Sequence, residues 1–147
     1  MLLPVTLVIA GACAIINLWL AIRLVRGRVT GKVMMGDGGV PTMVSGMRAH
    51  ANFTEYAPIL LILIALIELA RGPSPYLWAL GFVFVLARIA HPFGMDREGP
   101  NPFRAGGAMG TWAVTAILAG WALVIAYQAE VKQPTIEEVP VEVVPSA

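Results

Sequence analysis

The stretch "RAHANFTEYAPILLILIALIEL", residues 48–69, combines the two properties that decide the fold. Its second half is an unbroken run of apolar side chains at 59–67. Its first half carries charged, amide and phenol side chains instead. A membrane-spanning helix needs about 20 predominantly apolar residues, so the stretch predicts a transmembrane helix whose beginning is unusually polar.

The composition of the whole chain favours the same environment. The 147 residues are 58% hydrophobic and 13% charged, with a mean hydropathy of +0.76, whereas a soluble domain is about a quarter charged. The excess of apolar surface requires lipid to cover it. The predicted spans are residues 2–22, 53–69, 76–92 and 107–127. Because these runs are long and not strictly alternating, we expect an all-α, integral membrane four-helix bundle.

The charges predict the domain organisation and the orientation. Residues 1–128 form the expected four-span membrane domain, and 129–147 form a Pro-rich acidic tail that we expect to be disordered. Basic residues favour cytoplasmic loops. They gather in the loops that follow the first and third spans, as Arg23, Arg26, Arg28, Lys32, Arg97 and Arg104. Both of these loops are therefore predicted to face the cytoplasm, with both termini outside it.

This topology brings polar side chains from three helices to one membrane level. Four of them lie on the second helix at i, i+4, i+7 and i+8, which places them on one face: Arg48, Asn52, Glu55 and Tyr56. Arg88 and His91 end the third span, and Arg104 precedes the fourth. Arginine binds carboxylates, glutamate binds an ammonium group, and an amide both donates and accepts. The pattern suits a small zwitterion.

A purely structural interpretation explains part of the pattern. Arg48 could extend to the headgroups and Tyr56 could anchor at the interface. Asn52 and Glu55 lie deeper and are explained poorly in this way, so the residues favour a small-molecule site. His50 and His91 have no further His or Cys ligands, and no metal site is predicted.

Four segments together resemble the MAPEG superfamily, the membrane-associated proteins in eicosanoid and glutathione metabolism, and especially its bacterial inner-membrane branch. They are "GDGG" (36–39), "RAHANFTEYAP" (48–58), "ARIAHPFGM" (87–95) and "FRAGGAMGTW" (103–112). The resemblance implies a homotrimer with glutathione as cosubstrate, bound in the cytoplasmic half of the membrane between neighbouring subunits. The expected partners are membrane lipid, glutathione and a lipophilic small molecule, and not nucleic acid.

The resemblance also implies a role for each site residue. The implied glutathione contacts are Arg48, Asn52, Glu55, Tyr56 and His91. Arg104 matches the arginine proposed to stabilise the glutathione thiolate. Two positions depart from the family pattern: Met95 replaces a tyrosine of several members, and Ala105 replaces a hydroxyl residue implicated in thiol activation in some members.

Three functions follow as hypotheses. The first is a glutathione-dependent transferase or peroxidase acting on lipophilic electrophiles or hydroperoxides. The second, favoured by Met95 and Ala105, is a non-catalytic glutathione- or lipid-binding protein with the same fold. The third, a transporter with a proton relay through Glu55 and His91, is disfavoured because the spans are short and lack inverted repeats.

Seven residues outside the predicted contacts receive structural interpretations. Arg88 is expected to form a bundle-stabilising ion pair with Glu55, and Glu68 to be solvated near Arg71. Asn17 is expected to hydrogen-bond across helices. The four tryptophans, including Trp112, are expected to pack or to lie at the interface.

Overall fold

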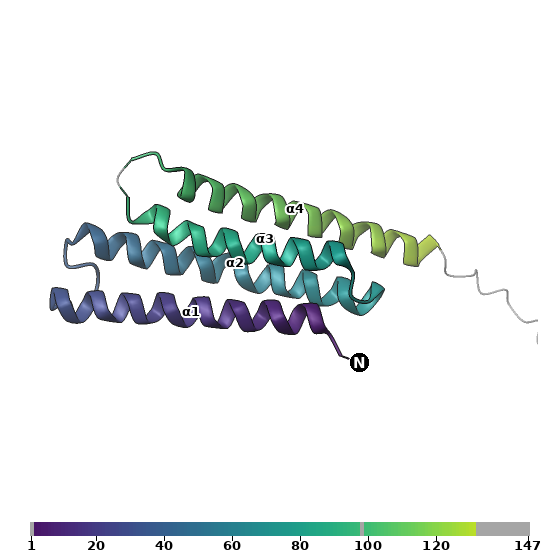
Figure 1. Cartoon of the computed structure of the whole chain (residues 1–147), viewed down its shortest axis with the longest axis horizontal. Helices are drawn as coiled ribbons and strands as arrows, with labels where there is room; N and C mark the ends of the chain where they lie inside the picture. The colour runs from purple at the N-terminus through teal and green to yellow at the C-terminus, as the bar shows by residue number, and fades with distance from the viewer. Residues whose placement is uncertain (1, 98, 132–147) are drawn as a thin grey trace, which may run out of the picture.

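The computed structural model describes residues 2–97 and 99–131 (Figure 1). Within these ranges the chain forms helices and no strands, which confirms the all-α four-helix prediction. The helices are α1 (Pro4–Gly31), α2 (Pro41–Arg71), α3 (Pro75–Met95) and α4 (Pro102–Val131). All four are long and apolar enough to cross a membrane. The α4 helix continues to Val131, past the predicted domain boundary at residue 128. The rest of the predicted tail, residues 132–147, lies outside the described residues.

Proline and glycine define where the helices begin and end. A proline opens each helix, at Pro4, Pro41, Pro75 and Pro102. Proline suits the first helical position because its fixed φ is already helical and the missing N–H has no partner there. After α2, Gly72 adopts a φ of 77°, a conformation that glycine enters without steric cost. These residues delimit the short turn between α2 and α3.

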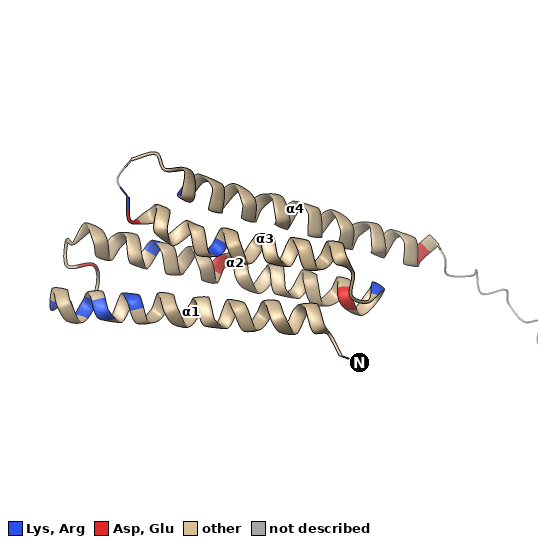
Figure 2. Ribbon diagram, in the orientation of Figure 1, with Lys and Arg blue, Asp and Glu red and all other residues tan. Residues whose placement is uncertain are grey.

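The four helices run alternately up and down, so that the α1–α2 and α3–α4 connections lie at one end of the bundle (Figure 1). We call this end the loop end. The central pair, α2 and α3, packs against each other and against both outer helices, whereas the described parts of α1 and α4 do not touch. Most arginines of the described chain gather toward the loop end (Figure 2).

The helices extend beyond the apolar runs at the loop end. The α1 helix continues to Gly31 rather than ending near residue 22, and α2 begins at Pro41 rather than Phe53. With 31 residues, α2 is roughly 46 Å long, which exceeds the ~30 Å hydrocarbon core of a bilayer. The predicted spans are shorter than the helices because hydropathy marks the apolar core, whereas the backbone hydrogen bonds of the helices continue into the polar layer. Arg48 therefore lies on a rigid helix.

One stripe of α1 illustrates how the core forms. Its buried residues recur every three or four positions: Val5, Ile9, Cys13, Ile16 and Leu20. This spacing keeps them on one helix face, which packs against the central pair. Large apolar side chains elsewhere on the bundle are exposed, including Ile15 at 72% and Leu123 at 72%. Hydrocarbon is the environment that suits such a surface, so the bundle contacts lipid.

Glu68 does not face solvent, and the prediction that it is solvated near Arg71 is wrong. It is 0% exposed. Its carboxylate accepts hydrogen bonds from the backbone N–H groups of Val5 (2.9 Å) and Thr6 (2.8 Å) and from the Thr6 hydroxyl (2.7 Å). The first turn of a helix has N–H groups without intrahelical partners, and α1 has no side-chain cap of its own. Glu68 supplies that cap from α2, while Arg71 donates to Gln128 on α4.

We predict that the cap stabilises the fold measurably. Glu68→Gln places an amide NH₂ group against N–H and O–H donors and should lower the free energy of unfolding by roughly 1–3 kcal/mol. The measurement is thermal unfolding in detergent, followed by circular dichroism. The control is Glu130→Gln at an exposed position of α4, which should leave the transition unchanged. An identical transition for both variants would contradict the capping role.

Candidate functional site

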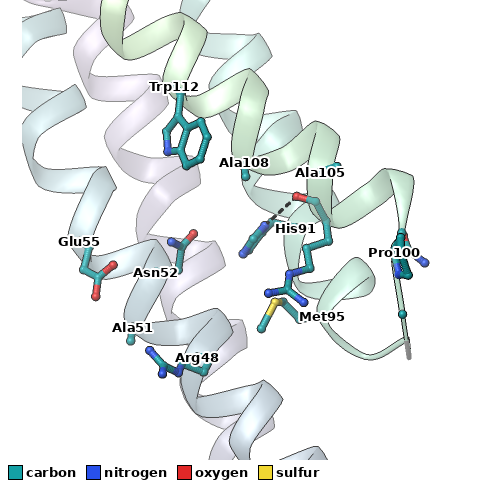
Figure 3. A pocket seen from close by; sticks show the side chains of 13 residues that line it. Arg48, Ala51, Asn52, Glu55, His91, Met95, Pro100, Ala105, Ala108 and Trp112 are labelled. Carbon is teal, nitrogen blue, oxygen red and sulfur yellow. Dashed lines mark hydrogen bonds between the residues drawn. The ribbon is translucent and has the colours of Figure 1, made fainter.

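A pocket of about 910 Å³ lies at the loop end, between α2 on one side and α3 and α4 on the other (Figure 3). The α3–α4 connection closes part of its rim. The α2 helix contributes Arg48, Ala51, Asn52 and Glu55, and α3 contributes His91 and Met95. The connection contributes Gly99, Pro100 and Asn101, and α4 contributes Arg104, Ala105, Ala108 and Trp112.

The pocket brings together five of the six predicted site residues: Arg48, Asn52, Glu55, His91 and Arg104. Figure 3 shows the α2 side chains facing those of α3 and α4 across the pocket. The sixth, Tyr56, is not a lining residue. Its hydroxyl accepts a hydrogen bond of 2.9 Å from the indole Nε1–H of Trp112, which is a lining residue. Tyr56 is therefore connected to the pocket through Trp112.

His91 is fixed by the first turn of α4. It is only 6% exposed, and its Nδ1 lies 3.3 Å from the carbonyl oxygen of Arg104. A carbonyl oxygen only accepts, so Nδ1 carries the proton in this contact. The other ring nitrogen points away from that carbonyl, toward the pocket (Figure 3). His91 can therefore present its Nε2 atom to a ligand in a defined orientation.

Arg88 does not pair with Glu55, so the predicted ion pair is wrong. Its side chain is 2% exposed. One terminal nitrogen donates to the Asn52 side-chain oxygen, and the other donates to the backbone carbonyl of Gly107, each at 2.7 Å. Arg88 faces the interior of the bundle, whereas Glu55 is exposed on the pocket side of α2.

Glycines let α4 approach α3 closely enough to position this network. A Cβ atom on Gly107 would lie 2.8 Å from the carbonyl oxygen of Ala87 and 2.8 Å from the Cβ of His91. A Cβ atom on Gly94 would meet the backbone of Arg104. Any larger residue at either position would force the helices apart. The close contact places Arg104 and the Gly107 carbonyl beside α3.

The charges of the pocket suit a ligand that carries both negative and positive groups. Arg48 and Arg104 line it together with a single described carboxylate, that of Glu55, and the buried guanidinium of Arg88 lies behind Asn52. Such a site attracts an anion and retains one position for an ammonium group. Within residues 2–97 and 99–131, no three His, Cys, Asp or Glu side chains cluster in a way that could hold a metal ion.

Trp112 is a lining residue that the sequence prediction assigned to packing or to the membrane interface. It lies eight residues after Arg104, with Ala108 between them. Positions i, i+4 and i+8 share one helix face, and this spacing could have revealed it. Elsewhere, the side-chain oxygen of Asn17 accepts a hydrogen bond of 2.8 Å from the Nε2–H of His50, which confirms the expected hydrogen bond between helices.

The fold and the site define a four-span helical membrane protein with a polar pocket at one end. Residues 6–124 match the sequence profile of the MAPEG family, and the chain belongs to that family. It is also similar to the inner membrane protein YecN of Escherichia coli strain K12, with 28% identity over 95 residues, or 65% of this chain and 72% of the relative. YecN of E. coli O6:H1 matches to the same extent.

We predict that the α3–α4 contact depends on the absence of a side chain at Gly107. Gly107→Ala should lower the free energy of unfolding by about 1–3 kcal/mol because the added methyl group clashes with α3. Gly106→Ala is the matched control, since nothing lies within 4 Å of its Cβ position. The control should be neutral or slightly stabilising. Equal thermal stability of the two variants in detergent would contradict the close contact.

Proposed function

We propose that this protein is a glutathione-dependent transferase or peroxidase of the bacterial inner membrane, acting on lipophilic electrophiles or hydroperoxides. The observation that carries the proposal is the meeting of two guanidinium groups, an amide and a carboxylate in one pocket. Glutathione has two carboxylates, one ammonium group and a thiol, which these side chains complement. Membership of the MAPEG family supports the choice of ligand.

In this proposal, the α2 residues bind the ends of the tripeptide. Arg48 pairs with a glutathione carboxylate and Glu55 with its ammonium group, because charge-assisted hydrogen bonds are the strong ones in a partly desolvated site. Asn52 hydrogen-bonds the peptide portion, and His91 contacts the ligand from α3. Tyr56 acts through its hydrogen bond with Trp112.

Arg104 is the proposed catalytic residue. A cysteinyl thiol has a pKa of ~8.5 and reacts as its thiolate, and a nearby guanidinium favours the anion. Arg104 lies in the first turn of α4, where the helix dipole also favours negative charge. The thiolate then attacks the electrophilic carbon, forming a C–S bond while the bond from that carbon to the leaving group breaks and the leaving group departs with the electron pair. With a hydroperoxide it attacks the terminal oxygen, the O–O bond breaks, and the alkoxide that leaves takes a proton from water to become the alcohol. The sulfenic acid formed on the first glutathione then reacts with the thiol of a second glutathione, which yields the disulfide and water.

The lipophilic substrate is proposed to arrive from the membrane side of α4. Trp112 is 57% exposed and lines the pocket next to Ala108, which joins the charged site to an apolar surface. We also propose, from the family resemblance, that three copies assemble with the sites between neighbours. The basic loop end suits the cytoplasmic side, with both termini outside it, and the name of the E. coli relative supports the inner membrane.

A non-catalytic binding protein is the second candidate. Met95 and Ala105 both line the pocket, and no lining residue carries a hydroxyl group. A ligand thiol in this pocket therefore lacks a hydroxyl donor from the described lining residues. This favours glutathione binding without thiolate formation.

Titration with glutathione distinguishes the two candidates. In detergent, binding accompanied by the ultraviolet absorbance of a thiolate supports the enzyme, and binding without it supports the binding protein. Arg48→Ala and Glu55→Ala should each weaken the affinity by at least about tenfold, since each removes one charge-assisted contact. Arg71→Ala is the matched control, because Arg71 lies at the opposite end of α2. The absence of binding by the unaltered protein would overturn the proposal.

A measurement of turnover tests the proposed role of Arg104. Arg104→Ala should preserve glutathione affinity within a few-fold, abolish the thiolate absorbance and reduce kcat by at least about a hundredfold, the usual scale for losing one electrostatic stabiliser. The assay is conjugation to a lipophilic electrophile in detergent or proteoliposomes. Unchanged turnover by Arg104→Ala would show that another group stabilises the thiolate.

A further inference from the structure

Arg88 is a buried cation whose described partners are neutral oxygens. It donates to the side-chain oxygen of Asn52 on α2 and to the Gly107 carbonyl on α4, both at 2.7 Å. The ring of Tyr56 lies 5.9 Å from its guanidinium carbon. Its Nε is buried without a described hydrogen-bond partner. Burying a cation in this way costs folding free energy. Stability alone therefore does not explain Arg88, and its effect on its neighbours is the better explanation.

The chemistry of a guanidinium determines how the Asn52 amide is turned. Arginine carries only donors, so the amide must present its oxygen to Arg88. The amide is planar, and its NH₂ group is thereby directed away from Arg88. Asn52 lines the pocket while Arg88 does not. We propose that Arg88 is a positioning residue that turns the Asn52 NH₂ group toward the pocket, so that the site takes a ligand carbonyl or carboxylate oxygen at this point.

The second hydrogen bond makes Arg88 a fixed support. The Gly107 carbonyl that receives it also accepts a hydrogen bond of 2.8 Å from the Thr111 hydroxyl. Gly107 is held against α3 by the contacts that its missing side chain permits. Arg88 therefore links the backbone of α4 to the Asn52 amide on α2, so that a shift of α4 would also move this amide. An asparagine without this support can turn its amide either way, and it then matches donors and acceptors equally.

The identity of the ligand rests on the proposed function, so the first test uses glutathione in a double-mutant cycle. Arg88→Met and Asn52→Ala should each weaken glutathione affinity by about tenfold. The double variant should be no weaker than either single variant, because Arg88 acts through Asn52. Arg88→Lys retains the charge but not the two-pronged geometry, and it should not restore affinity. Arg23→Met, which removes an arginine paired with Asp96 outside the pocket, is the control.

Independent losses in the cycle would overturn the proposal. A loss of affinity of about a hundredfold would be the product of the two single effects. If the double variant binds glutathione about a hundredfold more weakly than the unaltered protein, Arg88 acts independently of Asn52. Arg88→Met is expected to fold, because the Gly107 carbonyl retains Thr111 and Asn52 is open to the pocket. Circular dichroism of each variant checks this before titration.

A second measurement separates this proposal from the proposed function, because it needs no ligand. The ¹⁵N side-chain amide signal of Asn52, assigned by its disappearance in Asn52→Ala, should shift in Arg88→Met and remain in place in Arg23→Met. If the unaltered protein does not bind glutathione but this shift occurs, the ligand is wrong and the positioning role stands. If the signal is the same in Arg88→Met as in the unaltered protein, the positioning role is wrong whatever the ligand.

Discussion

In a helical bundle surrounded by hydrocarbon, a polar side chain is stable only where another helix or water meets it. This constraint determines where the polar residues of the protein lie and which partners they have. Glu68 is buried and receives the free N–H groups of α1. Arg88 is buried and donates to α2 and α4. Further polar or charged side chains line the pocket at the loop end, including Arg48, Asn52, Glu55, His91 and Arg104.

The pocket depends on the interior network more than on its own lining. Arg48 and Glu55 extend from exposed positions of α2, and alone they would be flexible charges near a membrane surface. The close approach of α3 and α4 at Gly107 and the hydrogen bonds of Arg88 fix the opposite wall relative to α2. A rigid interior beside exposed charges is the arrangement that favours binding with a defined orientation.

Sequence patterns were sufficient for the fold and for the polar side chains that α2 contributes to the pocket, because both follow from spacing along single helices. The apolar runs identified four helices, and the i, i+4, i+7 spacing placed Arg48, Asn52 and Glu55 on one face. The partners of Glu68 and Arg88 could not be obtained in this way. They depend on how helices cross, which is set by contacts such as Gly107 against Ala87. The helices also extend beyond the predicted spans, because hydropathy does not report backbone hydrogen bonds in the polar layer.

The most direct test of the account is an experimental structure of the protein in a lipid nanodisc with glutathione. We predict the tripeptide at the loop end, with its ammonium group against Glu55, a carboxylate against Arg48 and its sulfur beside Arg104. A structure in which Glu55 and Asn52 contact acyl chains, with glutathione absent from the space before Arg104, would contradict it.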